Sequence, residues 1–567
     1  MQRHWWWLWC FILLLYLVWL KPPISRAYVD FGDGNYQYIS WRLSQGVHLY
    51  TDILSPQPPL HLWLGCLVVK LSRVSGWDSL EIFRWSTHFI RAGSALCLFL
   101  IGWRLFRSGG VGWLASAVFL FLPEGYRWSS GYQSEHLEIL FLLTGLLASL
   151  SGHLWSRCVA VACGICALWT NMSSLPFSAI LFLHALICPQ FSIIPLAAGA
   201  GFFGLMLGGS FLLAGRAFWE NVWSNQVASI PSQASAWMAS LSEQGTTILT
   251  LEGGFILLAI LGLYRFIHSS GCGSPATESF RSRALVVLFG IASLGSGIYV
   301  VKGGTVDYIF SLGEPLIALF SSWALISWIR QSRAWNGGCH EEPHSARWIR
   351  IACQSVLIIG LVAILGWQPY RLACGLHFQM APGVDLADQS QGRIVEFSDL
   401  EVHTLLRVIR ELAPEGSTLW APPFLAALSQ HPIAMDLSET YLWWVRWQRE
   451  IQSGIKDPGV DRMLSGLTDL IEKKALPLLL INDRTGQWGM LLVPGRQLNH
   501  VPIRTLDPRI ERLQSMLEQH YQPIRKFPGS DQKLYFQGWN ERLEVWVPKG
   551  GVQVLSPWVK EGFSAGS

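Results

Sequence analysis

Charge is scarce in this sequence: only 14% of its 567 residues are Asp, Glu, Lys or Arg, while 51% are hydrophobic. A soluble domain normally carries about 25% charged residues. This deficit excludes an ordinary soluble protein. Together with a mean hydropathy of +0.32, it indicates a polytopic membrane protein with a soluble part attached. The net charge of +4 is small for the length and gives no reason to expect nucleic acid as a partner.

A disulfide framework and a metal-ligand set are also missing. The 11 cysteines are scattered, most of them inside apolar runs, and none follows Cys374. A secreted disulfide scaffold would instead be short and dense in cysteine. No His joins the acidic residues in a convincing ligand set, so the sequence assigns no metal site and no cofactor, and metal dependence stays open.

The N-terminus lacks a signal-peptide cleavage site. Arg3 and His4 precede the apolar run from Trp5 to Leu20, as in a signal peptide, but "KPPISR" follows it without a small-x-small pattern. We therefore interpret the run as an uncleaved first transmembrane helix with its N-terminus in the cytoplasm.

Long apolar runs occupy most of the first 367 residues. A span of about 30 Å of hydrocarbon needs roughly 17–25 residues. On this basis we predict about eleven transmembrane helices, near 5–20, 86–106, 110–123, 136–151, 155–171, 174–188, 191–214, 247–268, 284–301, 307–329 and 350–367.

Arg and Lys are unevenly shared between the loops, and this bias predicts the orientation. The loops assigned to the cytoplasm hold Arg104, Arg107, Arg157, Arg265, Arg281, Arg283, Arg330, Arg333, Arg347 and Arg350. The short outer loops hold only Arg127, Arg216 and Lys302. The bias places the segment after Trp367 outside the cytoplasm, which for a bacterial chain means the outer side of the inner membrane.

Two parts lie outside the predicted membrane region. The first outer loop, about 21–85, contains an amphipathic stretch, "HLWLGCLVVKLSRV", that we expect to lie in the membrane interface. The C-terminal part, 368–567, alternates short apolar runs with helical patterns. "STLWAPP" and "LPLLLIND" favour buried strands, while "DLEVHTLLRVIRELAP" and "PRIERLQSMLEQHY" favour amphipathic helices. The domains predicted are therefore a transmembrane domain, 1–367, and an extracytoplasmic α/β domain, 368–567.

Ionisable residues on the predicted outer side are candidate functional groups, because such residues at membrane depth are costly. They are Asp30, Asp33, Asp52, Glu124, Arg127, Glu135, Glu138, Lys302 and Asp307. Glu135 and Glu138 are three residues apart, so both can face one side of a helix that enters the membrane. Taken singly, each has an ordinary alternative as a solvated loop acid, a helix cap or a helix anchor. Their clustering at helix ends on one side is the informative feature.

The order of these motifs resembles the family 39 glycosyltransferases, the GT-C class that includes protein O-mannosyltransferases and the aminoarabinose transferase for lipid A. The first outer loop of that family is matched by "DFGDGNYQYISWRLSQGVHLYTDILSPQPPLHLW", 30–63, and an Arg-headed helix starts near Arg84. "SEHLEILFLLTGLLA" places Glu135 at the acid that opens the family's fourth membrane helix. "VDYIFSLGEPLIAL" resembles a further helix, with Asp307 at the usual His position, followed by Tyr308.

The sequence departs from the family pattern at two places. One is Asp307, and the other is "WTNMSSLP", 169–176, where the family pattern leads us to expect a Lys near Asn171. Both departures bear on how a lipid phosphate would be held.

The resemblance implies transfer of a sugar from a polyprenyl-phosphate donor, with inversion, at the outer membrane face. The acceptor would be an envelope glycan, lipid or protein, and membrane lipid would surround the donor chain. The resemblance makes a loop-one aspartate the general base, Asp33 first and Asp30 second, although the segment shows no periodicity that decides between them. The implied substrate-binding residues are Glu135, Glu138, Asp52, Arg127, Lys302, Asp307 and Tyr308.

A transporter or flippase of a lipid-linked saccharide is the alternative. It would favour charged or Pro/Gly-broken segments at mid-helix, in corresponding positions of two halves. The acids in this sequence instead cluster at helix ends, which favours the enzyme. A scaffold without activity gives no reason for that clustering.

Overall fold

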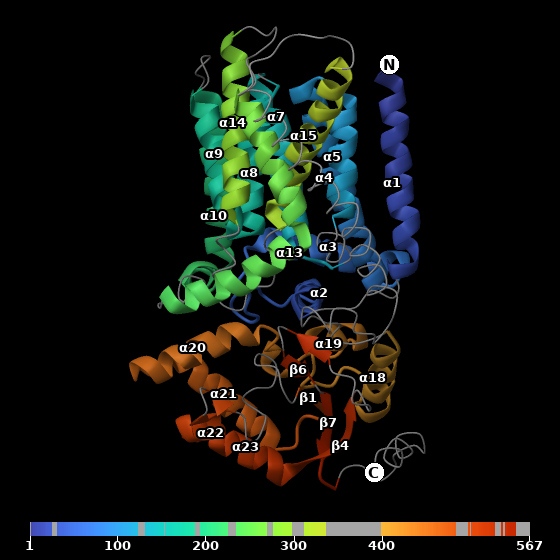
Figure 1. The fold of residues 1–567 in the computed structure, drawn as a ribbon. Coiled ribbons are helices and arrows are strands. Elements are labelled where there is room, and N and C mark those ends of the chain that lie inside the picture. Colours follow the sequence, from blue (N-terminus) through green and yellow to red (C-terminus); the bar gives the residue numbers. More distant parts are fainter. Residues whose placement is uncertain are drawn as a thin grey trace. The chain divides into compact units, whose positions relative to one another are not determined.

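The computed structural model describes residues 2–24, 31–122, 131–151, 153–187, 193–224, 234–268, 276–296, 311–335, 399–482, 497–498, 501–527, 534–536, 539–541 and 543–550. The chain forms two compact units. One combines 1–24, 84–209 and 230–377, and the other combines 25–83, 210–229 and 378–567. Figure 1 draws the chain as a ribbon, with its helices and strands labelled.

The first unit is a bundle of helices that accounts for ten of the eleven predicted spans. Its helices are α1 (Gln2–Ile24), α4 (Ser79–Phe106), α5 (Gly109–Phe121), α7 (Ser134–Ser149), α8 (Leu154–Thr170), α9 (Leu175–Ile187), α10 (Ile193–Ala214), α13 (Ala234–His268), α14 (Ala276–Gly295) and α15 (Glu314–Trp335). The start of α4 belongs to the second unit. The predicted span 350–367 lies outside the described residues, and the total of eleven stays a prediction.

By length and apolar composition, α4 and α10 could each cross a membrane, and several shorter apolar helices accompany them. The helix surfaces carry large apolar side chains that the described protein does not cover, among them Leu205 (75% exposed) and Leu212 (90% exposed) on α10. A soluble protein keeps such apolar patches small. This exposed apolar surface supports a membrane location.

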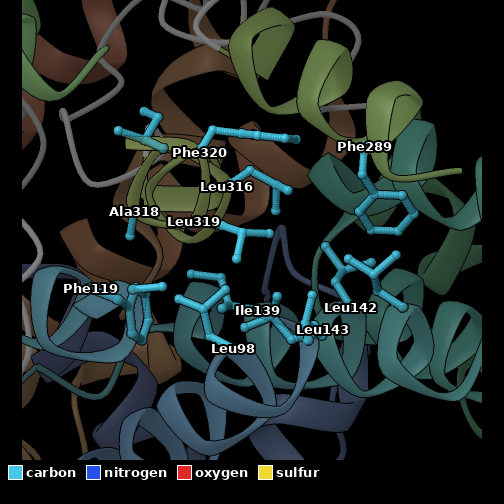
Figure 2. Close-up of a cluster of buried hydrophobic side chains, with 14 of the residues drawn as sticks. Leu98, Phe119, Ile139, Leu142, Leu143, Phe289, Leu316, Ala318, Leu319 and Phe320 are labelled. Carbon is cyan, nitrogen blue, oxygen red and sulfur yellow. The ribbon is translucent and has the colours of Figure 1, made fainter. Parts of the chain in front are cut away.

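A continuous apolar core holds the bundle together. Leu98 of α4, Phe119 of α5, Leu142 of α7, Phe289 of α14 and Phe320 of α15 are all at most 4% exposed. Figure 2 shows these side chains converging from five helices. Close backbone approach supplements this packing, as it does between helices in membranes. A Cβ atom on Gly262 of α13, for example, would collide with the Phe320 carbonyl.

The second unit starts with two helices from the predicted outer loop. α3 (Pro59–Ser75) begins at a proline, which suits the first helical turn, and it covers the predicted interfacial stretch. α2 (Phe31–Ser44) packs on α3 and on α19 (Pro423–Ser429). α2 lies within the predicted first outer loop, about 21–85, in a stretch whose residues show no periodicity around Asp33.

The C-terminal part of this unit contains the helices and one of the strands that were predicted. The predicted helices are α18 (Asp399–Leu412) and α23 (Pro508–His520), and they are joined by α20 (Thr440–Ser453), α21 (Pro458–Glu472) and α22 (Ile503–Leu506). The strands β1 (Leu479–Asn482), β7 (Leu543–Pro548) and β4 (Tyr521–Phe527) form an antiparallel sheet in that order. "STLWAPP" contributes only isolated bridges, at Leu419 and Trp420. The predicted boundary near 367 lies outside the described residues, so the division into two domains at that point stays a prediction.

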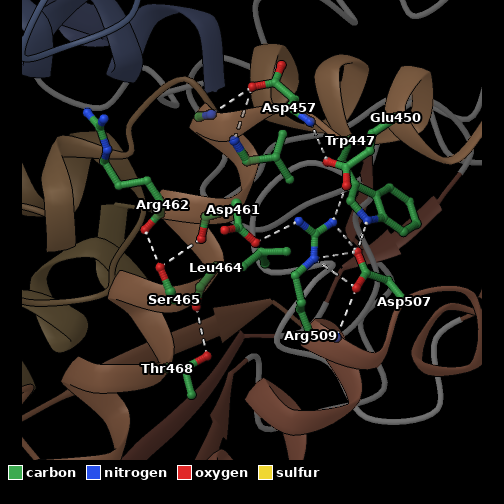
Figure 3. A network of polar contacts seen from close by, with 12 residues as sticks. Trp447, Glu450, Asp457, Asp461, Arg462, Leu464, Ser465, Thr468, Asp507 and Arg509 are labelled. Atoms are coloured by element: carbon green, nitrogen blue, oxygen red, sulfur yellow. Dashed lines mark hydrogen bonds and ion pairs between the residues drawn. The ribbon is translucent and has the colours of Figure 1, made fainter. Parts of the chain in front are cut away.

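Short strand pairs complete this unit: β2 (Gln497–Leu498) with β3 (Val501–Pro502), and β5 (Leu534–Phe536) with β6 (Trp539–Glu541). A partly buried, Arg-centred network ties α20, α21 and α23 together (Figure 3). In it, Arg509 contacts Glu450 at 2.8 Å and Asp507 at 2.7 Å, and the Trp447 indole N–H donates to Asp507 at 2.9 Å. The network fixes the helices of the C-terminal part against one another.

Candidate functional site

The predicted carboxylate pair lies at the start of α7, as the sequence indicated. Glu135 is 3% exposed and Glu138 is fully buried. Their spacing of three residues puts both on one side of the helix, and they lie close enough for their charges to interact. Two carboxylates so close repel one another when both are ionised.

The turn between α8 and α9 supplies the hydrogen-bond donors for this pair. Asn171 Nδ2 donates to Glu135 Oε1 at 3.1 Å and to Ser134 Oγ at 3.1 Å. Ser173 Oγ donates to Glu138 Oε1 at 2.8 Å. Asn171 Oδ1 in turn accepts from the Ser173 backbone N–H at 3.2 Å, which caps the short helix η1 (Met172–Ser174). An amide thus stands where the family pattern led us to expect a lysine.

Glu138 has no ion-pair partner within the described ranges; its hydrogen-bond partner there is Ser173. Burying an ionised carboxylate without a cation is costly in free energy, unless the carboxylate is protonated or a substrate brings a partner for it. The pair is therefore equipped to receive a hydroxyl or an amine as hydrogen-bond donor.

A stripe of buried basic residues on α4 was not assigned from the sequence. Arg84, His88 and Arg91 are each at most 1% exposed. Their spacing of four and then three residues places them along one face of the helix. The Tyr16 hydroxyl lies 3.3 Å from His88 Nδ1, and His88 is close enough to Arg84, Arg91 and His136 to be affected by their charges. His136 follows Glu135 directly, so the basic stripe and the acidic pair lie in the same region of the first unit.

Arg91 is only partly satisfied. Its Nη2 donates to the Phe119 carbonyl at 3.2 Å, and its guanidinium lies 4.8 Å from the Phe119 ring centre. Arg91 Nε and Nη1, and also His88 Nε2, are buried without a hydrogen-bond partner in the described part of the chain. Arginine does not lose its proton in proteins. The stripe therefore keeps a positive charge in an apolar bundle and favours an anion.

Asp52 belongs to the second unit. Its carboxylate accepts from the His48 backbone N–H at 3.0 Å and lies 3.0 Å from His48 Nδ1. The His48 backbone N–H is the main reason that the pKa of Asp52 is lowered. The side chain is half exposed, so its contacts are local.

The remaining predicted residues are described in part or not at all. The backbone of Asp33 is helical within α2, and its side chain lies outside what the structure describes. Asp30, Glu124, Arg127, Lys302, Asp307 and Tyr308 lie outside the described residues. Their roles stay predictions. The pattern Arg84-x3-His88-x2-Arg91 inside an apolar helix was the signal that could have revealed the basic stripe.

Neither a family model nor a curated protein matches this sequence. Solved structures do match. ArnT from Cupriavidus metallidurans bound to undecaprenyl phosphate has 16% identity and a TM-score of 0.52, over 83% of this chain and 92% of that chain.

Two further matches have lower TM-scores, and we base no inference on them. AglB, an archaeal oligosaccharyltransferase from Archaeoglobus fulgidus, has 12% identity and a TM-score of 0.45, over 91% of this chain and 79% of that chain. AftD, an arabinofuranosyltransferase from Mycobacteria, has 13% identity and a TM-score of 0.46, over 96% of this chain and 40% of that chain. The match to ArnT confirms the predicted likeness at the level of the fold: this chain has a GT-C glycosyltransferase fold.

Proposed function

We propose that the protein is a membrane glycosyltransferase that moves a sugar from a polyprenyl-phosphate donor to an envelope glycan, lipid or protein. The buried, permanently charged Arg91 is the observation that carries the proposal. Its two unpartnered nitrogens, with His88 and Arg84 along the same face, offer donors for a lipid phosphate within an apolar bundle. The solved structure with the same fold, ArnT, holds undecaprenyl phosphate.

The reaction needs a base, a nucleophile and a stabilised leaving group. A carboxylate on α2 or just before it, Asp33 first and Asp30 second, takes the proton of the acceptor hydroxyl or amine. The acceptor atom then bonds to the anomeric carbon as the bond from that carbon to the phosphate oxygen breaks, with inversion. The electron pair leaves with the lipid phosphate, whose charge is met by the basic stripe on α4, assisted by Lys302 or Arg127. A positioned base typically contributes about 10²–10⁴-fold.

The remaining groups bind the substrates in this proposal. Glu135 and Glu138 accept hydrogen bonds from the acceptor or from the donor sugar, beside the hydrogen bonds that they accept from Asn171 and Ser173. Asp52, Asp307 and Tyr308 are the further substrate-binding residues in this proposal. This assignment agrees with the family 39 likeness of the sequence, and it places the active region at the outer membrane face, with the N-terminus in the cytoplasm.

The first test identifies the lipid. We expect mass spectrometry of the detergent-purified protein to find polyprenyl phosphate, with or without a sugar. Comparison of envelope glycans and lipids from cells with and without the gene should then reveal the product. Recovery of ordinary phospholipid alone, with solute or lipid transport in liposomes, would instead establish the transporter alternative.

The second test concerns the base. The variant that combines Asp30→Asn with Asp33→Asn keeps shape and hydrogen bonding but accepts no proton at neutral pH. We expect transfer to fall about 10²–10⁴-fold, or roughly 3–5 kcal/mol, while undecaprenyl phosphate still binds. Asp469→Asn, which breaks an exposed pair with Lys473, serves as control and should transfer at the parent rate. A well-folded double variant that transfers at the parent rate would exclude both acids as the base.

A further inference from the structure

The C-terminal segment, residues 378–567 of the second unit, holds α2 through a bidentate ion pair. Arg42 Nε donates to Asp436 Oδ1 at 2.6 Å and Nη2 donates to Oδ2 at 2.8 Å. The two side chains are only 17% and 16% exposed. Such paired contacts between a guanidinium and a carboxylate fix geometry as well as adding energy, so this pair fixes the orientation of α2.

Tyr38 adds to the same contact from one turn earlier. Its hydroxyl donates to Asp436 Oδ1 at 2.6 Å and accepts from the Ile433 backbone N–H at 2.8 Å. Burial, with the neighbouring Asp436 carboxylate, holds the pKa of Tyr38 well above its usual value. The phenol therefore stays protonated and keeps donating over the whole physiological range.

The contacts continue to the start of α2. Asn35 Nδ2 donates to Glu439 Oε2 at 2.6 Å, and both residues are buried. Gly34 packs so tightly on α19 that a Cβ atom there would lie 2.6 Å from Phe424 Cβ. Asn35, Tyr38 and Arg42 are spaced by three and four residues, as on one helix face. The contacts thus reach the residues that directly follow Asp33.

Asp436, which accepts the hydrogen bonds of Tyr38 and Arg42, lies in a strained turn. Met435 and Asp436, in the short helix η5 (Ala434–Asp436), have positive φ angles of 56° and 52°. Non-glycine residues rarely adopt this region. Such strain persists only where the surroundings over-determine it, and it concentrates at functional sites. The turn that binds Tyr38 and Arg42 is therefore held in one geometry by the rest of the segment.

We propose that Asp436 and Glu439 are positioning residues: they hold α2 so that its first turn, with Asp33, has the placement that the reaction needs. The C-terminal segment then contributes to the chemical step and not only to the choice of acceptor. This inference rests on the proposed function, because the role of Asp33 is proposed there.

Asp436→Asn and Glu439→Gln test the proposal in the full-length protein. Transfer is measured as formation of the gene-dependent product, and lipid binding is measured with undecaprenyl phosphate by native mass spectrometry. We expect transfer to fall about 10- to 100-fold with lipid binding unchanged, because a misplacement of about 1 Å can cost about 10²-fold. A purely structural defect would lower binding and transfer together.

Asp457→Asn is the matched control. Asp457 and Arg446 form an equally close bidentate pair, with side chains 23% and 22% exposed, within the C-terminal segment. We expect this variant to transfer at the parent rate. If it loses as much transfer as Asp436→Asn, general loosening of the segment explains the effect and the proposal fails.

Gly34→Ala is the second variant, since it displaces α2 without removing any polar group. We expect the same loss of transfer with retained binding, and faster hydrogen exchange of the peptide 31–44 in Gly34→Ala and Asp436→Asn than in Asp457→Asn. Parent-like transfer and exchange in both variants would overturn the proposal. If the parent itself makes no gene-dependent product, the proposed function fails, while the exchange of 31–44 still shows whether the segment holds α2.

Discussion

Asn171 is the residue on which the acidic pair of α7 depends. It donates to Glu135 and accepts from the Ser173 backbone N–H. Replacing Asn171 with Leu keeps the number of side-chain heavy atoms but removes these bonds, together with the bond to Ser134, and leaves a buried carboxylate oxygen with fewer donors. We expect the protein to lose about 1–3 kcal/mol of unfolding free energy, measured as a lower thermal unfolding midpoint in detergent.

Two variants make this prediction decisive. Ser465→Ala removes only an exposed hydroxyl that bonds a backbone carbonyl of its own helix, so the midpoint of this variant should stay at the parent value. Asn171→Lys supplies the side chain that the family pattern favours, and its ammonium can donate to Glu135. We therefore expect it to lower the unfolding midpoint less than Asn171→Leu does. An unchanged midpoint in Asn171→Leu would mean that Glu135 does not rely on Asn171.

At the residue scale, the sequence could place side chains relative to one another only within a single helix. The spacing of Glu135 and Glu138 was enough to place both on one side of α7, and both are buried. Their partners, Asn171 and Ser173, lie 35 or more residues away in a turn. No local pattern reveals such a contact, because the packing of α7, α8 and α9 creates it.

At the scale of single elements, Asp507 connects the start of α23 to its neighbours. It caps the helix by accepting from the Arg509 backbone N–H, and it also accepts from the Trp447 indole. We expect Asp507→Asn to lower the local unfolding free energy of α21 and α23 by about 1–2 kcal/mol, because Arg509 is partly exposed and keeps Glu450 and Asp461 as partners. Hydrogen exchange of peptides 458–472 and 508–520 measures this.

The acid dependence of that difference follows from the pKa of Asp507. Burial raises it, but hydrogen bonds from Arg509 and from Trp447 outweigh burial, so the pKa lies below its usual value. The stabilisation is therefore complete above the unfolded pKa of about 3.9 and is lost as the pH falls through the folded pKa. The difference in local unfolding free energy between the parent and Asp507→Asn should be constant near neutral pH and should disappear only below about pH 4. If this difference disappears between about pH 6 and 7, its pH dependence arises from another titrating group and not from Asp507.

The amphipathic helices α18 and α23 were predictable because their apolar residues recur at helical spacing and an Asp-Pro pair opens α23. α2 was not predictable from its residues. Gly32, Gly34 and Asn35 have low helix propensity, and the helix is stabilised by packing on α3 and α19 and by its bonds to Asp436 and Glu439. Asp436 and Glu439 lie some 400 residues away in the sequence.

At the scale of the whole molecule, the order of motifs predicted the fold better than any one motif. Identity to ArnT is only 16%, yet the TM-score of 0.52 extends over 83% of this chain. The length of the apolar runs pointed to ten of the described helices, because a segment that spans the hydrocarbon needs roughly 17–25 residues. Run length alone does not reveal the basic stripe of α4. The spacing of Arg84, His88 and Arg91 carries that signal, and the packing of the surrounding helices buries all three.

Orientation is the whole-molecule prediction that the fold leaves untested. The bias of Arg toward alternate loops predicts that the chain after Trp367 lies outside the cytoplasm. A reporter that is active only outside the cytoplasm, fused after Gly366, should be active, and a cytoplasmic reporter there should be silent. The same two reporters fused after Arg107 should give the opposite result. The base, the acidic pair and the C-terminal segment are all proposed to act on one side of the membrane. Activity of the cytoplasmic reporter at Gly366 would place α2 and the residues that hold it on the opposite side from an outward-facing donor. The proposed reaction could then not occur there.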